Sequence, residues 1–354
     1  MHSESRADTS QRPGRAAQFA HASVIGLHAR PAIRRAPLSK GNARPASNRE
    51  HRGGTGRNSR ANIGDDPPYS AVSVGYWFVV RKSVLMLRVT LLGTGSPSPS
   101  LVRHHPAVIV HWGDHGSALV DAGDSVVGQL LAAGEALRGV DRVLFTHLHW
   151  DHILGYPAFV WGSWKVGRTR LDVTGLIGTQ DMHRRLMEGF YREQAEWAID
   201  LGYDRHGWDD TVVRDVEAGW STDIDGCRIE AGSVVHPPMA SLAWRFTFAG
   251  RSLVVSGDTA RCDELVAFAR DADVLVVDAC ASAPAWDAPA KRRTIVERLH
   301  EFHASPQDCI DMAAAARVAT VVLTHHLPEA RLDVDTTGYG GTVIIGNDLD
   351  VIEV

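Results

Sequence analysis

The run THLHWDH at residues 146–152 constrains this chain more than any other feature, because it holds three histidines and an aspartate within six positions. The residues before it, 140–145, indicate a buried strand, so the run begins where a strand passes into a loop. Side chains alternate along extended backbone, so His147 and His149 are expected on one side. Once the chain turns, the side chains of Asp151 and His152 can face a second position beside the one that His147 and His149 face. Imidazole and carboxylate ligands suit zinc and, to a lesser degree, iron or manganese, so the run predicts a metal site.

Three later residues complete an ordered set of candidate ligands: His236, Asp258 and His325. Each stands beside the C-terminal end of a short β-rich segment, where open α/β layers place their chemistry. Alone, each has a plainer explanation, since such a histidine is often structural and an aspartate after Ser-Gly often forms a turn. His326 competes with His325, and only one of the two is expected to bind because adjacent strand residues point in opposite directions.

The ordered set resembles the metallo-β-lactamase superfamily, and within it the branch that holds ribonuclease Z and the zinc-dependent arylsulfatases. The resemblance covers residues 86–354. Further segments that carry it are Leu91–Pro97, Leu119–Gly123, Ser256–Thr259, His303–Ser305, Leu323–His325 and Val343–Leu349.

The resemblance implies a two-metal centre. One metal would take His147, His149 and His236, the other would take Asp151, His152 and His325, and Asp258 would bridge them. The expected cofactors are two Zn²⁺ per chain, with Mn²⁺ or Fe²⁺ as alternatives. The expected nucleophile is a hydroxide between the metals, because metal binding lowers the pKa of water toward roughly 7. His325 is preferred to His326 because it occupies the family's Thr-His position.

Asp151, Asp258 and His303 are the expected catalytic residues, and His303 is the candidate proton donor to the leaving group. The alternative for His303 is a residue that merely flanks a helix. Ser305 is expected to cap the helix that begins at Pro306. Two further aspartates are considered beside the site. Asp121 is either an acceptor for a ligand histidine N–H or a turn residue, and Asp278, which stands where ribonuclease Z has a glutamate, is left without a role. Trp150, Trp161 and Trp164 either wall a pocket beside the metal run or belong to the core.

Two β-rich halves with interspersed helices predict an α/β (α+β) fold, a four-layer αββα sandwich. The expected strands are 86–92, 107–111, 118–121, 142–145, 228–235, 243–248, 252–255, 274–278 and 320–324. The expected helices are 125–138, 153–161, 180–201, 263–270 and 306–318. Residues 202–215 are expected to be a polar connection.

Residues 1–85 differ in composition from the rest. They carry 14 basic and 5 acidic side chains, whereas residues 86–354 carry 23 basic and 37 acidic ones. The first segment lacks apolar periodicity and is interpreted as a disordered basic leader or a start-site artefact, with a transit peptide as the alternative. Residues 86–354 form the predicted hydrolase domain. The apolar run 71–80 is too short to span a membrane. Cys227, Cys262, Cys280 and Cys309 fit buried thiols of a cytoplasmic protein.

The acidic balance of residues 86–354 argues against a large nucleic-acid footprint, because backbone affinity is mostly electrostatic. The segment 187–210 is rich in Tyr, Trp, Glu and Asp, without a Gly/Pro-rich basic arm. The main prediction is therefore a hydrolase for a small phosphodiester or sulfate ester. The alternatives are ribonuclease Z-like 3′ processing of tRNA, lactonase or thioesterase activity, and a non-catalytic metal-binding scaffold. The expected partner is a small ester, and tRNA is the alternative. No membrane partner is expected, and a homodimer is left open.

Overall fold

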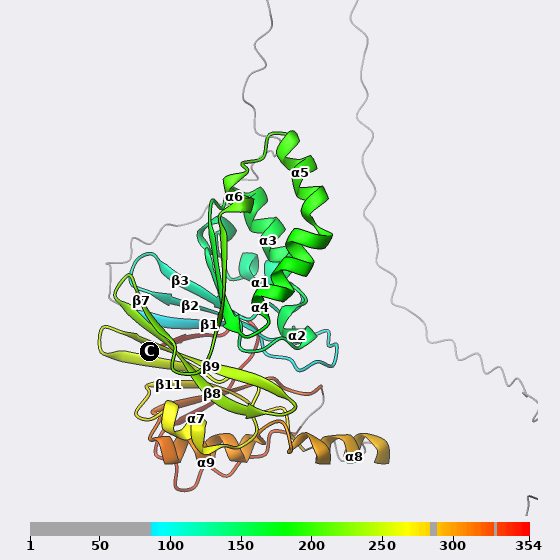
Figure 1. Cartoon of the computed structure of the whole chain (residues 1–354). Coiled ribbons are helices and arrows are strands. Elements are labelled where there is room, and N and C mark those ends of the chain that lie inside the picture. Colours follow the sequence, from blue (N-terminus) through cyan, green and yellow to red (C-terminus); the bar gives the residue numbers. More distant parts are fainter. Residues whose placement is uncertain (1–85, 284–288, 329–330) are drawn as a thin grey trace, which may run out of the picture. The chain divides into compact units, whose positions relative to one another are not determined.

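The computed structural model describes residues 86–283, 289–328 and 331–354. The predictions made for residues 1–85 lie outside these ranges. Within them, fourteen strands form two seven-stranded sheets that pack face to face with helices on both outer faces (Figure 1). The predicted four-layer αββα sandwich is confirmed. No helix in the described ranges is long and apolar enough to cross a bilayer.

The first sheet has the strand order β14-β1-β2-β3-β4-β5-β6 and is parallel from β3 to β6. Its strands are β1 (Leu87–Gly93), β2 (Ala107–Trp112), β3 (Gly116–Val120), β4 (Arg142–Leu144), β5 (Leu171–Leu176), β6 (Thr211–Val216) and β14 (Val351–Glu353).

The second sheet has the order β13-β12-β11-β10-β9-β8-β7 and is parallel from β10 to β13. Its strands are β7 (Ser221–Ile224), β8 (Cys227–His236), β9 (Met239–Phe248), β10 (Arg251–Val255), β11 (Val274–Asp278), β12 (Thr320–Thr324) and β13 (Thr342–Ile345).

The helices divide between the two outer faces (Figure 1). They are α1 (Val126–Ala132), the 3-10 turn η1 (Leu137–Gly139), α2 (Trp150–Ile153), α3 (Tyr156–Lys165), α4 (Thr179–His183), the π-helical segment η2 (Arg184–Phe190), α5 (Arg192–Asp200), α6 (His206–Asp209), α7 (Asp263–Phe268), α8 (Ala290–Leu299) and α9 (Pro306–Ala316). Side chains of α1 and α3 pack on the first sheet, and those of α7 and α9 pack on the second.

Burial of apolar side chains explains the layering. Alternate residues of β1, such as Val89 and Leu91, enter the core between the sheets together with Trp244 of β9, while their neighbour Leu92 faces the helices. A strand whose two faces are both buried reads as a continuous apolar run rather than an alternating one. Strands β10, β11 and β12 fit this pattern, and their expected bounds agree with the structure to within one residue.

Several expected elements were wrong in detail. The helix expected at 125–138 ends at Ala132 and is followed by η1, and the helix expected at 153–161 is divided into α2 and α3. The single helix expected at 180–201 is interrupted by η2. The polar connection expected at 202–215 contains α6 and most of β6, and β5, β7, β13, β14 and α8 were not predicted.

The two tryptophans Trp161 and Trp164 belong to the helical layer rather than to a pocket wall at the metal run. They pack against each other and against Trp208, with ring centroids 5.0–5.3 Å apart. All four cysteines are free and buried, as expected.

Candidate metal centre

Asp121 fixes the backbone where β4 passes into the histidine run. Its Oδ1 accepts a hydrogen bond of 2.8 Å from the Thr146 amide, and its Oδ2 accepts one of 2.7 Å from the Thr146 hydroxyl. The same Oδ2 also accepts a 2.8 Å hydrogen bond from His152 Nδ1, which turns His152 Nε2 away from the Asp121 carboxylate. Asp121 is therefore the acceptor for a histidine N–H that the sequence suggested, and it sets that ring's orientation.

The first group of ligand atoms comes from β8, the run after β4 and the turn after β10. Its members are His147, His149, His236 and Asp258, whose ligand atoms all lie within 4.8 Å of one another. His149 Nδ1 is 3.0 Å from His147 Nε2 and 3.1 Å from His236 Nε2. His236 Nδ1 donates a 2.8 Å hydrogen bond to the Phe302 carbonyl, so its Nε2 points into the group.

The second group consists of Asp151, His152 and His325, again with all ligand atoms within 4.8 Å. His325 Nε2 lies 3.3 Å from Asp151 Oδ2, and His152 Nε2 lies 3.7 Å from the same oxygen. His325 follows β12 with a φ of 61°. By contrast, His326 donates a 2.9 Å hydrogen bond from Nε2 to the Leu323 carbonyl and is not a member of the group.

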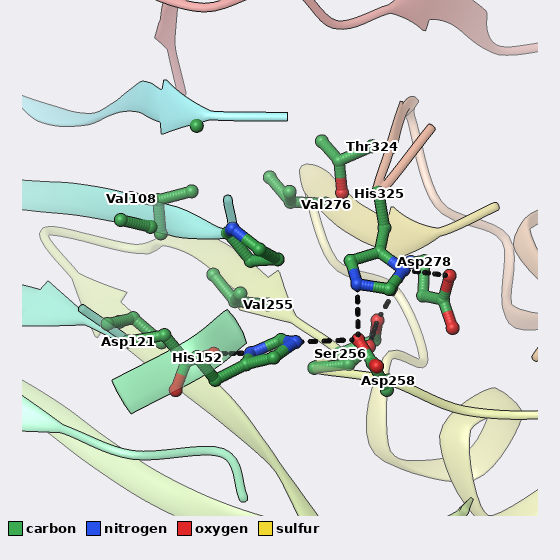
Figure 2. A pocket seen from close by; sticks show the side chains of 15 residues that line it. Val108, Asp121, His152, Val255, Ser256, Asp258, Val276, Asp278, Thr324 and His325 are labelled. Atoms are coloured by element: carbon green, nitrogen blue, oxygen red, sulfur yellow. Dashed lines mark hydrogen bonds and ion pairs between the residues drawn. The ribbon is translucent and has the colours of Figure 1, made fainter. Parts of the chain in front are cut away.

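Asp258 joins the two groups, because each of its carboxylate oxygens faces a different one. Oδ1 lies 3.2 Å from His152 Nε2 and 3.5 Å from His325 Nε2. Oδ2 lies 3.6 Å from His147 Nε2 and 3.9 Å from His236 Nε2. In Figure 2, dashed lines join Asp258 to both His152 and His325. A carboxylate so placed can bind two cations at once.

The pKa shifts of the buried histidines differ in direction between the two groups. Burial, reinforced by the neighbouring His152, holds the pKa of His147 well below its usual value. Burial also disfavours the charged forms of His152 and His325, but the Asp258 carboxylate and other nearby carboxylates outweigh it and raise the pKa of both rings. Burial opposes ionisation of Asp258 too, yet His325, His152 and His147 hold its pKa well below the usual range. The pocket thus favours ionised carboxylates, which attract cations.

The residues present fit divalent cations. One buried atom of a proposed ligand, Asp151 Oδ1, makes no hydrogen bond among the described residues. Buried polar atoms without partners are rare and costly. Imidazole and carboxylate donors in two adjoining groups are a ligand set typical of zinc, manganese or iron. All seven predicted ligands are brought together here, and their binding of metal stays a prediction.

Asp278 at the end of β11 connects His325 to His303. Its Oδ2 accepts a 2.7 Å hydrogen bond from His303 Nδ1, and its Oδ1 lies 3.2 Å from His325 Nδ1. The amides of Thr259 and Cys280 donate to the two oxygens, at 3.1 and 2.8 Å, and hold the carboxylate in place. Sequence reasoning left Asp278 without a role, although its position at the end of an apolar strand was the available signal.

His303 lies beside the ligand groups, as the sequence suggested. Its ring stacks on that of His325 with centroids 5.4 Å apart and planes at 23°. Its Nδ1 lies 3.8 Å from Asp258 Oδ2. Burial disfavours the charged imidazole, but the Asp278 and Asp258 carboxylates outweigh it and raise the pKa of His303. The predicted helix cap is confirmed, because Ser305 and Asp308 form a reciprocal capping box at the start of α9.

Comparisons with known proteins agree with this geometry. Residues 117–326 match the family model described as the beta-lactamase superfamily domain. A ribonuclease Z of Mycobacterium sp. (strain KMS) is 32% identical over 286 residues, covering 76% of this chain and 96% of that protein. A ribonuclease Z of Mycobacterium tuberculosis (strain ATCC 25618 / H37Rv) is 31% identical over 283 residues, covering 76% and 98%.

Solved structures share the fold. Human tRNase Z, short form, superimposes with a TM-score of 0.57 at 21% identity, covering 75% of this chain and 98% of that one. The metallo-β-lactamase fold protein YhfI from Bacillus subtilis gives a TM-score of 0.57 at 20% identity, covering 77% and 100%.

Proposed function

The chain belongs to the metallo-β-lactamase superfamily and is ribonuclease Z-like, and we propose that its site hydrolyses a phosphodiester of RNA with two bound Zn²⁺ ions. The observation that carries the proposal is the placement of Asp258, with one oxygen toward each of two ligand groups. Two cations held side by side can stabilise both the attacking and the leaving oxygen of a displacement at phosphorus.

The ligand assignment follows the two groups. His147, His149 and His236 would hold one cation, Asp151, His152 and His325 would hold the other, and Asp258 would contact both. Bound cations would supply positive charge for the phosphoryl oxygens and would lower the pKa of a water molecule. Mn²⁺ or Fe²⁺ fits the same donors, so the identity of the metal is part of the test.

One proposed ligand, Asp151, and one neighbouring side chain, His303, provide for the proton transfers. Asp151 Oδ1, which makes no hydrogen bond among the described residues, is available to accept a proton from the attacking water. His303, whose pKa is raised chiefly by the Asp278 carboxylate against the effect of burial, holds a proton for the leaving oxygen. Asp278 keeps the His303 ring in place through the 2.7 Å hydrogen bond.

For the substrate, the comparisons favour the alternative over the main sequence prediction. Relatives that are named ribonuclease Z align over nearly their whole length. We therefore place 3′ processing of precursor tRNA first. The acidic balance of residues 86–354 keeps a small phosphodiester as the second candidate, because it weakens long-range attraction for an RNA backbone.

The test uses the full chain loaded in turn with Zn²⁺, Mn²⁺ and Fe²⁺, at moderate salt. The substrates are a precursor tRNA with a 3′ trailer, bis-(4-nitrophenyl) phosphate and 4-nitrophenyl sulfate. We expect a single cleavage at the 3′ side of the tRNA body and slower hydrolysis of the small diester. Hydrolysis of the small diester with an intact tRNA would move the assignment to the second candidate. Preferred hydrolysis of the sulfate would reject the phosphodiester proposal.

A further inference from the structure

Trp150 is an exposed aromatic side chain in the middle of the histidine run. It lies between His149 and Asp151, one proposed ligand from each metal group, and 49% of its surface is exposed. Consecutive Cα atoms are about 3.8 Å apart, so the indole is attached within one residue of both groups. Isolated exposed apolar side chains are common, but this one is inserted between two proposed metal ligands.

The ligand groups reach solvent at His149, the residue directly before Trp150. Of the seven proposed ligands, only His149 is partly exposed, and the other six are buried. His236, whose Nε2 lies 3.1 Å from His149 Nδ1, is followed by the exposed Pro237 and Pro238. A substrate that approaches the ligands from solvent therefore passes the residues next to His149.

A neighbouring ring restricts Trp150 without covering it. The His105 ring packs at right angles to the indole, with centroids 4.9 Å apart and planes at 89°. His105 is itself buried, and its backbone amide donates to Asp124. An edge-to-face contact occupies at most one face of the indole, so at least one face is free of it. Leu154, four residues later and also exposed, extends the apolar surface along the same side of the helical turn.

We propose that Trp150 forms a nucleobase subsite: a base of the substrate stacks on the exposed indole face while the adjacent phosphate lies at the ligand groups. The inference rests on the proposed function and specifies its substrate as a phosphodiester next to an aromatic base. Stacking on an indole tolerates any base, because every base has a π-face. The subsite would thus bind a nucleotide of RNA without reading its sequence and without a basic surface.

The kinetic test compares two diesters that release the same leaving group. Thymidine 5′-(4-nitrophenyl phosphate) carries a base, and methyl 4-nitrophenyl phosphate does not. In Trp150→Ala, the ratio of kcat/KM for the thymidine ester to that for the methyl ester falls about tenfold or more, mainly through KM. Trp150→Phe restores most of the ratio. Trp197→Ala, which removes an indole that is 62% exposed on α5, leaves the ratio unchanged.

A binding measurement separates this inference from the proposed function. Calorimetry on the metal-loaded full chain compares thymidine 5′-monophosphate with inorganic phosphate. The wild type binds the nucleotide more tightly, and Trp150→Ala abolishes the difference. If the wild type hydrolyses neither these diesters nor the precursor tRNA, the proposed function fails while the calorimetry still tests the subsite.

Three results would overturn the subsite. The first is an unchanged substrate ratio in Trp150→Ala together with unchanged nucleotide binding. The second is an equal loss on both esters with a lower metal content in both the Ala and Phe variants, which would make Trp150 a structural part of the loop. The third is a change in oligomeric state without a change in the ratio, which would assign the indole to a contact between chains.

Discussion

His303 Nδ1 donates a 2.7 Å hydrogen bond to Asp278 Oδ2 in a buried pocket beside the proposed metal ligands. The pairing fixes the ring so that its other nitrogen, Nε2, is the one left for a substrate. Burial favours a neutral imidazole, but the two nearby carboxylates, Asp278 first, raise the pKa of His303. The arrangement thus favours the imidazolium form, which can donate a proton.

Replacing His303 with alanine should slow substrates according to their leaving groups. An alkoxide leaves only with a proton, whereas nitrophenolate needs little assistance, so the loss should be about a hundredfold for a nucleoside leaving group and far smaller for a nitrophenyl ester. The comparison variant is Asp278→Asn, measured on the same two substrate types. We expect its rate loss on the nucleoside leaving group to lie between that of the wild type and that of His303→Ala. Equal losses on both substrate types would remove His303 as the proton donor.

The same pairing predicts how the rate depends on pH. His303 carries its proton below its raised pKa and loses it as the pH rises through that value. The rate on the poor leaving group should therefore fall at high pH relative to the nitrophenyl rate. This relative fall should be absent in His303→Ala.

Asp258→Asn should lower the metal content and the turnover together. The amide keeps the shape of the side chain but supplies one neutral oxygen, so it cannot serve both ligand groups. We expect elemental analysis to find about one equivalent fewer metal per chain than in the wild type. Asp271→Asn, which alters an exposed carboxylate paired with Arg317, is the control and should keep both values. Full occupancy with near-normal turnover in Asp258→Asn would reject the bridging role.

The ligand set could be inferred from the sequence because its residues follow strands whose apolar runs are easy to recognise. Asp258 and His325 stand next to β10 and β12, and the run at His147 follows β4. The sequence does not show how the ends of separate strands pack against one another. The contacts that Asp278 makes with His303 and His325 join residues 25 and 47 positions apart, and no local periodicity encodes them.

The elements that were not predicted are mostly short or partly exposed. Strands β6 and β7 alternate between half-buried and exposed residues, so they lack an apolar run. The helix expected at 180–201 is broken by Gly189 and the π-helical η2, where the local pattern still looks helical. Propensity indicates a helix in such a segment, while tertiary packing decides its register.

Gly257 has a conformation and an environment that should not accept a side chain. Its φ is +62°, and a Cβ there would lie 2.6 Å from the Thr146 Cβ, the residue that Asp121 holds at the head of the histidine run. Gly257→Ala should therefore lower both stability and metal content. Gly250→Ala is the matched control, since its φ is +81° but nothing lies within 4 Å of the added carbon. Gly250→Ala should lower the stability only through backbone strain, by about 1 kcal/mol, and should keep its metal content. Equal thermal shifts and equal metal contents in the two variants would contradict the steric argument.

His183 of α4 should make stability depend on pH away from the metal centre. It is buried, and its Nδ1 lies 2.6 Å from the Tyr156 hydroxyl. Burial, with a smaller contribution from Arg168, lowers the pKa of His183 to about 4. In the unfolded chain a histidine binds its proton near pH 6.5. Between those two values the unfolded state binds more protons, so this residue destabilises the fold as the pH falls below about 6.5.

His183→Gln removes that effect. Between pH 6.5 and 5.5, the free energy of unfolding should fall by about 1 kcal/mol more in the wild type than in the variant. Urea denaturation at the two pH values measures both slopes, and identical slopes would show that His183 is already charged or accessible in the folded protein.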